Sequence, residues 1–194
     1  SVLPIEWDRA EAEAPARLPA QLPPSFARPT LLVNNAAEDV GGRTRFDASS
    51  ADELARVIEV NLVGVIRMVR AFVPGMLEAD QGDIVNVSSI QALRITPTVA
   101  AYTASKTGLD GLSDVLRADY AKTGIRVTEV FPGATKTGFA QSRFRGDAER
   151  AKAHFAERDR VLAPQDIADA VQYAVTRPRH VNVQRVVVTP SWQW

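Results

Sequence analysis

Three residues of this sequence could together move a proton to or from a substrate oxygen: Ser89, Tyr102 and Lys106. Tyr102 and Lys106 are four positions apart in a stretch with helical spacing, so both side chains should lie on one helix face. A lysine ammonium beside a tyrosine favours the phenolate and lowers the tyrosine pKa, which makes the phenol a general acid or base near neutral pH. Ser89 ends the preceding apolar run, and its hydroxyl could hydrogen-bond a carbonyl or an alcohol.

A tyrosine and a lysine one turn apart also occur together on ordinary exposed helices, so the pair alone does not indicate catalysis. Its position after a strand that ends in Ser88-Ser89 favours the functional interpretation, because ligands bind beyond the carboxyl ends of parallel strands. Asn61 is a further candidate, because it lies inside an apolar helical stripe and a buried amide needs hydrogen-bond partners. It could pack against neighbouring backbone, hold a catalytic water, or do both.

The elements that must position these residues follow from hydrophobic periodicity. Ser50, three positions before Glu53, is typical of a helix start, and Pro74 should kink or end the helix that follows. The Pro-rich stretch 9–29 predicts a short helix and an irregular connector. Helical spacing predicts helices over 51–78, 101–123 and 164–176, with a mobile helix around 147–158. Continuous apolar runs predict strands buried on both faces of a parallel sheet at 1–5, 30–33, 84–88, 125–131 and 183–189.

Alternation of strands and helices predicts an α/β fold, a doubly wound parallel sheet of the Rossmann-like type with helices on both faces. Its 194 residues suit a single domain spanning 1–194. Lys plus Arg and Asp plus Glu both number 23, so neither nucleic acid nor an anionic membrane is an expected partner. There is no cysteine, and His154 and His180 lack partners at metal-ligand spacing, so no metal site is expected. No apolar run is long enough for a membrane span and no secretory leader is visible, so we expect a cytoplasmic protein.

The order of several motifs resembles that of short-chain dehydrogenases/reductases, over essentially the whole chain. The interval of thirteen between Ser89 and Tyr102 also matches that family. The tail from Arg143 through Pro190 resembles a bacterial branch that acts on serine-type hydroxy acids and clavulanate-type aldehydes. The motifs are Asn34-Asn35-Ala36-Ala37, Asn61, Val87-Ser88-Ser89, Tyr102-Thr103-Ala104-Ser105-Lys106, and Pro132-Gly133 with Thr137.

The resemblance implies reversible hydride transfer between NADP or NAD and a small alcohol or carbonyl substrate. Tyr102 would exchange the proton, Ser89 would polarise the carbonyl, and Asn61 would anchor a water. Lys106 would bind the nicotinamide ribose and tune Tyr102. The resemblance also implies a set of cofactor-binding residues, namely Asp8, Asn34, Ala36, Tyr102, Lys106, Pro132, Gly133, Thr135 and Thr137.

The sequence departs from the family at its beginning, where no glycine-rich turn follows a first strand. The first two strands of the family fold, on the order of 50 residues, are therefore absent. The strand at Leu31–Val33 should then lie at an exposed edge of the sheet. A smaller departure is Ala37, which stands where the family usually has glycine. Either the sequence belongs to a truncated or incompletely given enzyme, or the chain is a non-catalytic remnant that serves as a binding or oligomerisation module.

Residues 134–163 are predicted to form a substrate lid. Phe139, Phe144 and Phe155 could contact an organic substrate or anchor the lid to the core. The broad apolar stripes of helices 51–78 and 101–123 could serve the monomer core alone, whereas the resemblance implies a homodimer or homotetramer through them. The sequence decides neither the substrate nor the choice between NAD and NADP.

Overall fold

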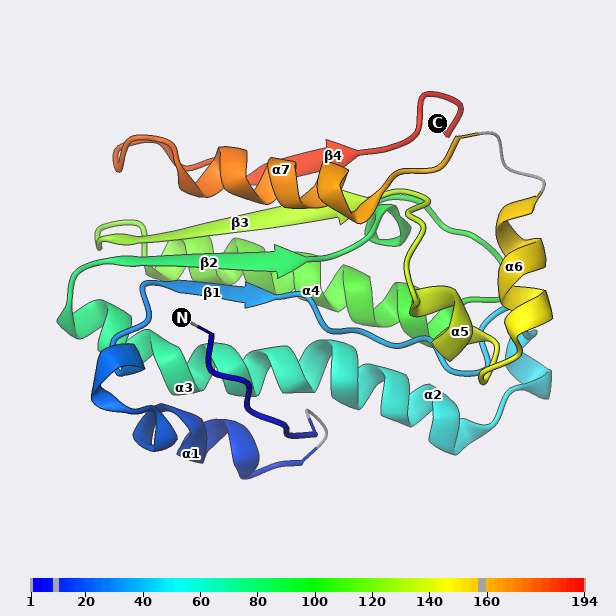
Figure 1. The fold of residues 1–194 in the computed structure, drawn as a ribbon, viewed down its shortest axis with the longest axis horizontal. Helices are drawn as coiled ribbons and strands as arrows, with labels where there is room; N and C mark the ends of the chain where they lie inside the picture. Colours follow the sequence, from blue (N-terminus) through cyan, green and yellow to red (C-terminus); the bar gives the residue numbers. More distant parts are fainter. Residues whose placement is uncertain (1, 9–10, 157–159, 194) are drawn as a thin grey trace.

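A computed structural model describes residues 2–8, 11–156 and 160–193 of the chain. Its centre is one parallel sheet, in which the strands follow the order of the sequence from one edge to the other (Figure 1). All three neighbouring pairs are parallel, and Val33 pairs with Val85 while Val85 pairs with Thr128. This sheet confirms the predicted fold class. The strands are β1 (Leu31–Asn34), β2 (Gly82–Val87), β3 (Ile125–Pro132) and β4 (Arg185–Val188).

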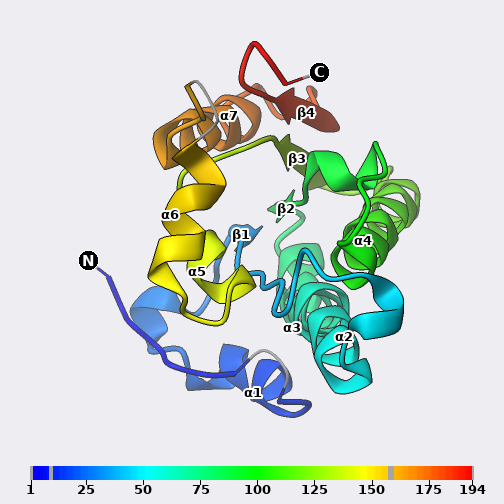
Figure 2. The same cartoon turned by 90° about the vertical axis from the view of Figure 1, so that its right-hand side faces the viewer.

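Helices cover both faces of the sheet, as predicted. Helices α3 (Gly64–Glu78) and α4 (Ala100–Asp119) pack on one face, and α7 (Pro164–Val175) packs on the other, over β3 and β4 (Figure 2). The connector 9–29 contains the predicted short helix, α1 (Ala14–Gln21), which packs against α3. The main core lies between the sheet and the first pair of helices, where the least exposed side chains include Val65, Met76, Ile84, Leu109 and Val127.

The predicted helix 51–78 is one continuous helical stretch with a π-helical turn in its middle. It consists of α2 (Ala51–Ile58), the turn Glu59–Val63, and α3. The Ser50 hydroxyl accepts a hydrogen bond from the Glu53 backbone N–H, so the predicted helix start is confirmed. Of the two outcomes expected at Pro74, a kink or an end of the helix, the second does not occur, because α3 continues through this proline. A proline removes one backbone hydrogen bond, and the burial of Val73 and Met76 on the same turn outweighs that loss.

The same helical stretch, Ala51–Glu78, is long and apolar enough to cross a membrane by length and composition, because an 18-residue window within it has a mean hydropathy of 1.5. The expectation that no run reaches this length is therefore wrong. Val57, Val65 and Met76 of this stretch are 1–2% exposed in the protein core, however. The apolar face of this stretch accordingly packs against the sheet and α4.

Two predictions about the first strands are wrong. Residues 2–5 form no strand in the described part of the chain, and Ser1 lies outside it. A strand needs a neighbour to receive its backbone hydrogen bonds, and no strand lies beside this segment in the described sheet. Strand β1 is buried on one face only, because Leu31 is 42% and Val33 41% exposed. Its position at the sheet edge agrees with the prediction made from the missing strands.

The predicted lid follows β3 and lies beyond the carboxyl ends of the strands (Figure 1). It contains α5 (Phe139–Arg143) and α6 (Ala148–Ala156). Helix α6 confirms the helix expected around 147–158, of which residues 157–158 lie outside the described chain, whereas α5 was not predicted. Three 3₁₀ turns complete the described helical segments: η1 (Pro24–Phe26), η2 (Phe46–Ala48) and η4 (Ile90–Ala92).

Candidate active site

A cavity of about 840 Å³ opens at the carboxyl ends of the strands, between the ends of β2 and β3, helix α4 and the segment 134–163, the predicted lid. This is the end of a doubly wound sheet where ligands bind. Most of the predicted site residues therefore meet in one place, although their chain positions extend over a hundred residues. The predicted residues that line it are Ala36, Ser89, Tyr102, Lys106, Pro132, Gly133, Thr135 and Thr137.

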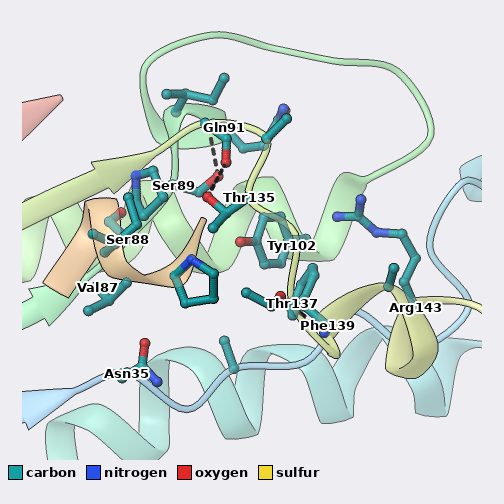
Figure 3. A pocket seen from close by; sticks show the side chains of 18 of the residues that line it. Asn35, Val87, Ser88, Ser89, Gln91, Tyr102, Thr135, Thr137, Phe139 and Arg143 are labelled. Atoms are coloured by element: carbon teal, nitrogen blue, oxygen red, sulfur yellow. Dashed lines mark hydrogen bonds between the residues drawn. The ribbon is translucent and has the colours of Figure 1, made fainter. Parts of the chain in front are cut away.

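Tyr102 and Ser89 face the same part of this cavity (Figure 3). Ser89 follows β2 and caps the turn η4, where its hydroxyl accepts a hydrogen bond from the backbone N–H of Gln91 at 3.2 Å. Tyr102 lies in the first turn of α4. Ser89 and Tyr102 are each only 8% exposed. The strand end and the helix start therefore position the serine and the tyrosine, and Phe139 of the predicted lid packs against the Tyr102 ring, with ring centroids 5.4 Å apart.

The pKa of Tyr102 lies above its ordinary value, in the opposite direction to the sequence expectation. Burial is the main cause, because it penalises the charged phenolate. A hydrogen bond with Ser89 and the positive charge of Arg143 lower the pKa by smaller amounts. Tyr102 is therefore a neutral phenol in this structure, and so a proton donor.

Lys106 lies one turn after Tyr102 on the same helix face, as its spacing predicts. Its Nζ atom lies 5.7 Å from the centroid of the Tyr102 ring. The ammonium donates a hydrogen bond of 2.8 Å to the backbone carbonyl of Val87, at the end of β2. Lys106 thus connects helix α4 to the strand end while it lines the cavity.

Asn61 is buried as expected, but it does not line the cavity. Its Oδ1 accepts a hydrogen bond from the Glu38 backbone N–H at 2.9 Å, and its Nδ2 donates to the Glu38 carbonyl at 2.8 Å. Nδ2 also donates to the Ser105 hydroxyl at 3.2 Å. The side chain thus joins the loop after β1 to α4, from within a π-helical turn of the kind often found near functional sites.

Two predicted cofactor-binding residues also lie outside the cavity lining. Asn34 is 5% exposed and donates a hydrogen bond to Asn86 Oδ1 at 2.9 Å, so it joins β1 to β2. The next residue, Asn35, lines the cavity instead, because successive side chains of an extended chain point to opposite sides. Asp8 lies near Arg56, with 3.7 Å between Oδ2 and Nη2.

The sequence analysis missed a buried ion pair at the cavity wall. Arg143 Nε donates a hydrogen bond of 2.7 Å to Asp39 Oδ2, and the two side chains are only 10% and 4% exposed. Burial raises the pKa of Asp39, and the Arg143 and Arg43 charges partly offset this effect. Since 104 positions separate the two partners, no local pattern could have identified the pair.

The aromatic residues of the lid divide between the two predicted roles. Phe139 and Phe155 line the cavity. Phe144 is not part of the lining and instead packs edge-on against His154, with ring centroids 5.6 Å apart. Phe144 therefore anchors the lid helices to each other, whereas Phe139 and Phe155 are placed to contact a ligand.

The fold and the site define a Rossmann-like α/β domain with a cavity at its strand ends. A model of the short chain dehydrogenase family matches residues 1–148. The chain belongs to this family. It is 32% identical over 193 residues to an NADP-dependent 3-hydroxy acid dehydrogenase of Schizosaccharomyces pombe, a match that covers 100% of this chain and 74% of the relative.

Solved structures of dehydrogenases resemble the chain closely. A closed form of serine dehydrogenase complexed with NADP⁺ superposes with a TM-score of 0.92 at 31% identity, covering 96% of this chain and 75% of the other. A 4-hydroxyisoleucine dehydrogenase complexed with NADH and succinate gives 0.79 at 28% identity, with 97% and 78% covered. The sequence thus spans about three quarters of these relatives, and the family resemblance inferred from its motifs is confirmed.

Proposed function

We propose that the protein is an NAD(P)-dependent oxidoreductase that interconverts a small alcohol and its carbonyl compound. The observation that carries the proposal is the convergence of Ser89, Tyr102 and Lys106 on one cavity at the strand ends. Among similar proteins, the fission yeast relative is named as NADP-dependent and solved neighbours were complexed with NADP⁺ or NADH, which supports both cofactors as candidates.

Tyr102 is the general acid and base of the proposed reaction. During carbonyl reduction the phenol gives its proton to the substrate oxygen, and during alcohol oxidation it takes that proton back. The raised pKa keeps Tyr102 protonated at neutral pH, as the donor role requires, and it also makes the phenol a weaker acid than an exposed tyrosine. Ser89 donates a hydrogen bond to the same substrate oxygen and so polarises the carbonyl. Asn61 is proposed to support a water in the proton relay through the loop and helix that it joins.

The cavity fits the nicotinamide end of a dinucleotide. The Gln91 Oε1 atom is buried at the cavity without a hydrogen-bond partner among the described residues, so it can accept a hydrogen bond from a ligand. Lys106, Thr135 and Thr137 would hold the ribose and phosphates, together with Ala36, Pro132 and Gly133, and we retain Asp8 and Asn34 as proposed contacts on the adenosine side. When bound, the cofactor supplies or accepts the hydride.

We also propose that the protein works in the cytoplasm as a homodimer or homotetramer, with helices α2 to α4 as the contact surface. Ile66, Leu77 and Val115 on these helices are 41–56% exposed, which supports such a contact. As predicted from the sequence, we propose that the partner is a small-molecule substrate and that the protein binds neither nucleic acid nor a membrane.

The test combines intact mass, fluorescence titration with NADPH and NADH, and turnover by the wild type and Tyr102→Phe. Saturable binding and turnover that Tyr102→Phe lowers about 100-fold to 10,000-fold would support the proposal, because acid–base catalysis typically contributes that much. Unchanged turnover in Tyr102→Phe would overturn the mechanism. A mass of 21.1 kDa without cofactor binding would favour the alternative, a non-catalytic remnant.

A further inference from the structure

Arg143 is placed at the cavity wall with part of its hydrogen-bonding capacity unused. Its side chain is 10% exposed, and Nε is fixed by Asp39. Within the described chain, Nη1 and Nη2 donate no hydrogen bond to a protein acceptor. A guanidinium has five N–H donors, so the fork of Arg143 retains donors for a ligand.

The guanidinium of Arg143 lies over the rings of Tyr102 and Phe139, and all three residues line the cavity. Its Cζ atom lies 5.8 Å from the ring centroid of Tyr102 and 5.0 Å from that of Phe139. In Figure 3, Arg143 lies on one side of the Tyr102 ring and Ser89 lies on the other. A short molecule whose oxygen contacts Tyr102 and Ser89 would therefore extend toward Arg143.

The charge of the cavity favours an anion. The described lining includes Arg43, Lys106 and Arg143 but no aspartate or glutamate. Asp39 accepts a hydrogen bond from Arg143 Nε and does not itself line the cavity. An arginine that is oriented by one carboxylate can bind a second one through its remaining parallel N–H groups.

We propose that Arg143, oriented by Asp39, binds the carboxylate of the substrate and so selects short hydroxy acids and the corresponding oxo acids. This inference rests on the proposed oxidoreductase function and extends it to the substrate class. The cofactor phosphates are the competing anions. They are distinguished by kinetics, since a substrate contact raises the KM of the substrate and leaves the KM of NADP⁺ unchanged.

The experiment compares 3-hydroxybutanoate with its neutral methyl ester as substrates for the full chain. In the wild type the acid should have at least about a tenfold higher kcat/KM than the ester. Arg143→Gln should lower kcat/KM for the acid by about 10-fold to 150-fold, mainly through KM, as expected for one lost charge-assisted contact. The ester should change less than about threefold, because it loses no charged contact.

Two further variants separate recognition from folding. Arg143→Lys keeps the charge and should restore part of the preference for the acid. Arg145→Gln removes an exposed arginine two positions away and should leave kcat/KM for both substrates unchanged. Equal losses for acid and ester in Arg143→Gln, or no preference for the acid in the wild type, would overturn the proposal.

Saturation-transfer NMR with the same two compounds keeps the two proposals distinguishable. Binding of 3-hydroxybutanoate that is lost in Arg143→Gln, without turnover in any variant, would support the carboxylate site and count against the oxidoreductase function. Equal turnover of acid and ester in every variant would support the oxidoreductase function and count against the carboxylate site.

Discussion

Two largely buried arginine–aspartate pairs lie at opposite ends of the sheet, and they differ in how much of the guanidinium is used. At the amino ends of the strands, Arg126 Nε donates to Asp83 at 2.7 Å. At the carboxyl ends, Arg143 Nε donates to Asp39 at the same distance. The other nitrogens of Arg126 donate to four backbone carbonyls at and just after the end of α7, those of Val175, Arg177, Pro178 and Val181.

The difference separates a structural clamp from a binding group. Arg126 satisfies carbonyls at the end of a helix, which would otherwise lack partners, and it closes the C-terminal part of the chain onto the sheet. Arg143 has one protein acceptor within the described residues and faces a cavity. Burial and an acidic partner are common to both, so the count of satisfied donors is what distinguishes them.

The largest predicted effect tests this comparison directly by removing each arginine. Arg126→Met should lower the free energy of unfolding by about 3–5 kcal/mol, because it leaves several buried carbonyls without a donor, whereas Asp83 keeps its ion pair with Arg179. Arg143→Met should cost only about 1–2 kcal/mol, because one hydrogen bond is lost and Asp39 keeps the charge of Arg43 nearby. Urea unfolding at pH 7 measures both values. Equal losses would mean that both arginines are clamps.

Glu129 sharpens the comparison, because it is a fully buried acid with no arginine partner among the described residues. Burial raises its pKa from 4.5 to about 7. The folded state then binds a proton more tightly than the unfolded state, so stability should fall by about 3 kcal/mol as the pH rises from about 4.5 to about 7. In Glu129→Gln this loss should be absent, and the variant should be more stable than the wild type at pH 8. Stability that rises over the same pH range in the wild type would contradict the assignment.

A smaller effect concerns the coupling between Asp39 and Arg143. A double-mutant cycle with Asp39→Asn and Arg143→Gln should give an interaction energy of about 1–2 kcal/mol, because the pair is in contact and buried. Thermal or urea unfolding of the four proteins gives the value. Additive single effects would show that Asp39 does not orient Arg143.

The smallest effect is predicted for Arg145, which pairs with Glu53 on the surface at 2.6 Å. Its side chain is 57% exposed, so water and salt screen the pair. Arg145→Gln should leave the melting temperature unchanged within experimental error, measured by circular dichroism beside Arg143→Gln. A clear loss of stability would show that the lid depends on charge rather than on burial.

Much of the fold follows from local sequence patterns. The buried runs of β2 and β3 and the helical stripes of α3 and α4 carry their periodicity within a few neighbouring residues. These elements occur as predicted, although α4 ends at Asp119 rather than at residue 123 and β2 begins at Gly82 rather than at residue 84. The one-sided exposure of β1 and the missing strand at residues 2–5 were not predicted. Both depend on what lies next to a segment in space, and local periodicity contains no such information.

The candidate site divides in the same way. The sequence alone determined that Tyr102 and Lys106 share a helix face and that Ser89 ends a strand, because helical period and strand direction are local properties. Tertiary structure decided that burial raises the pKa of Tyr102 and that Asn61 binds the loop after β1. It also decided that Arg143, 104 positions from Asp39, meets it at the cavity wall, because packing of the whole chain sets burial and long-range pairing.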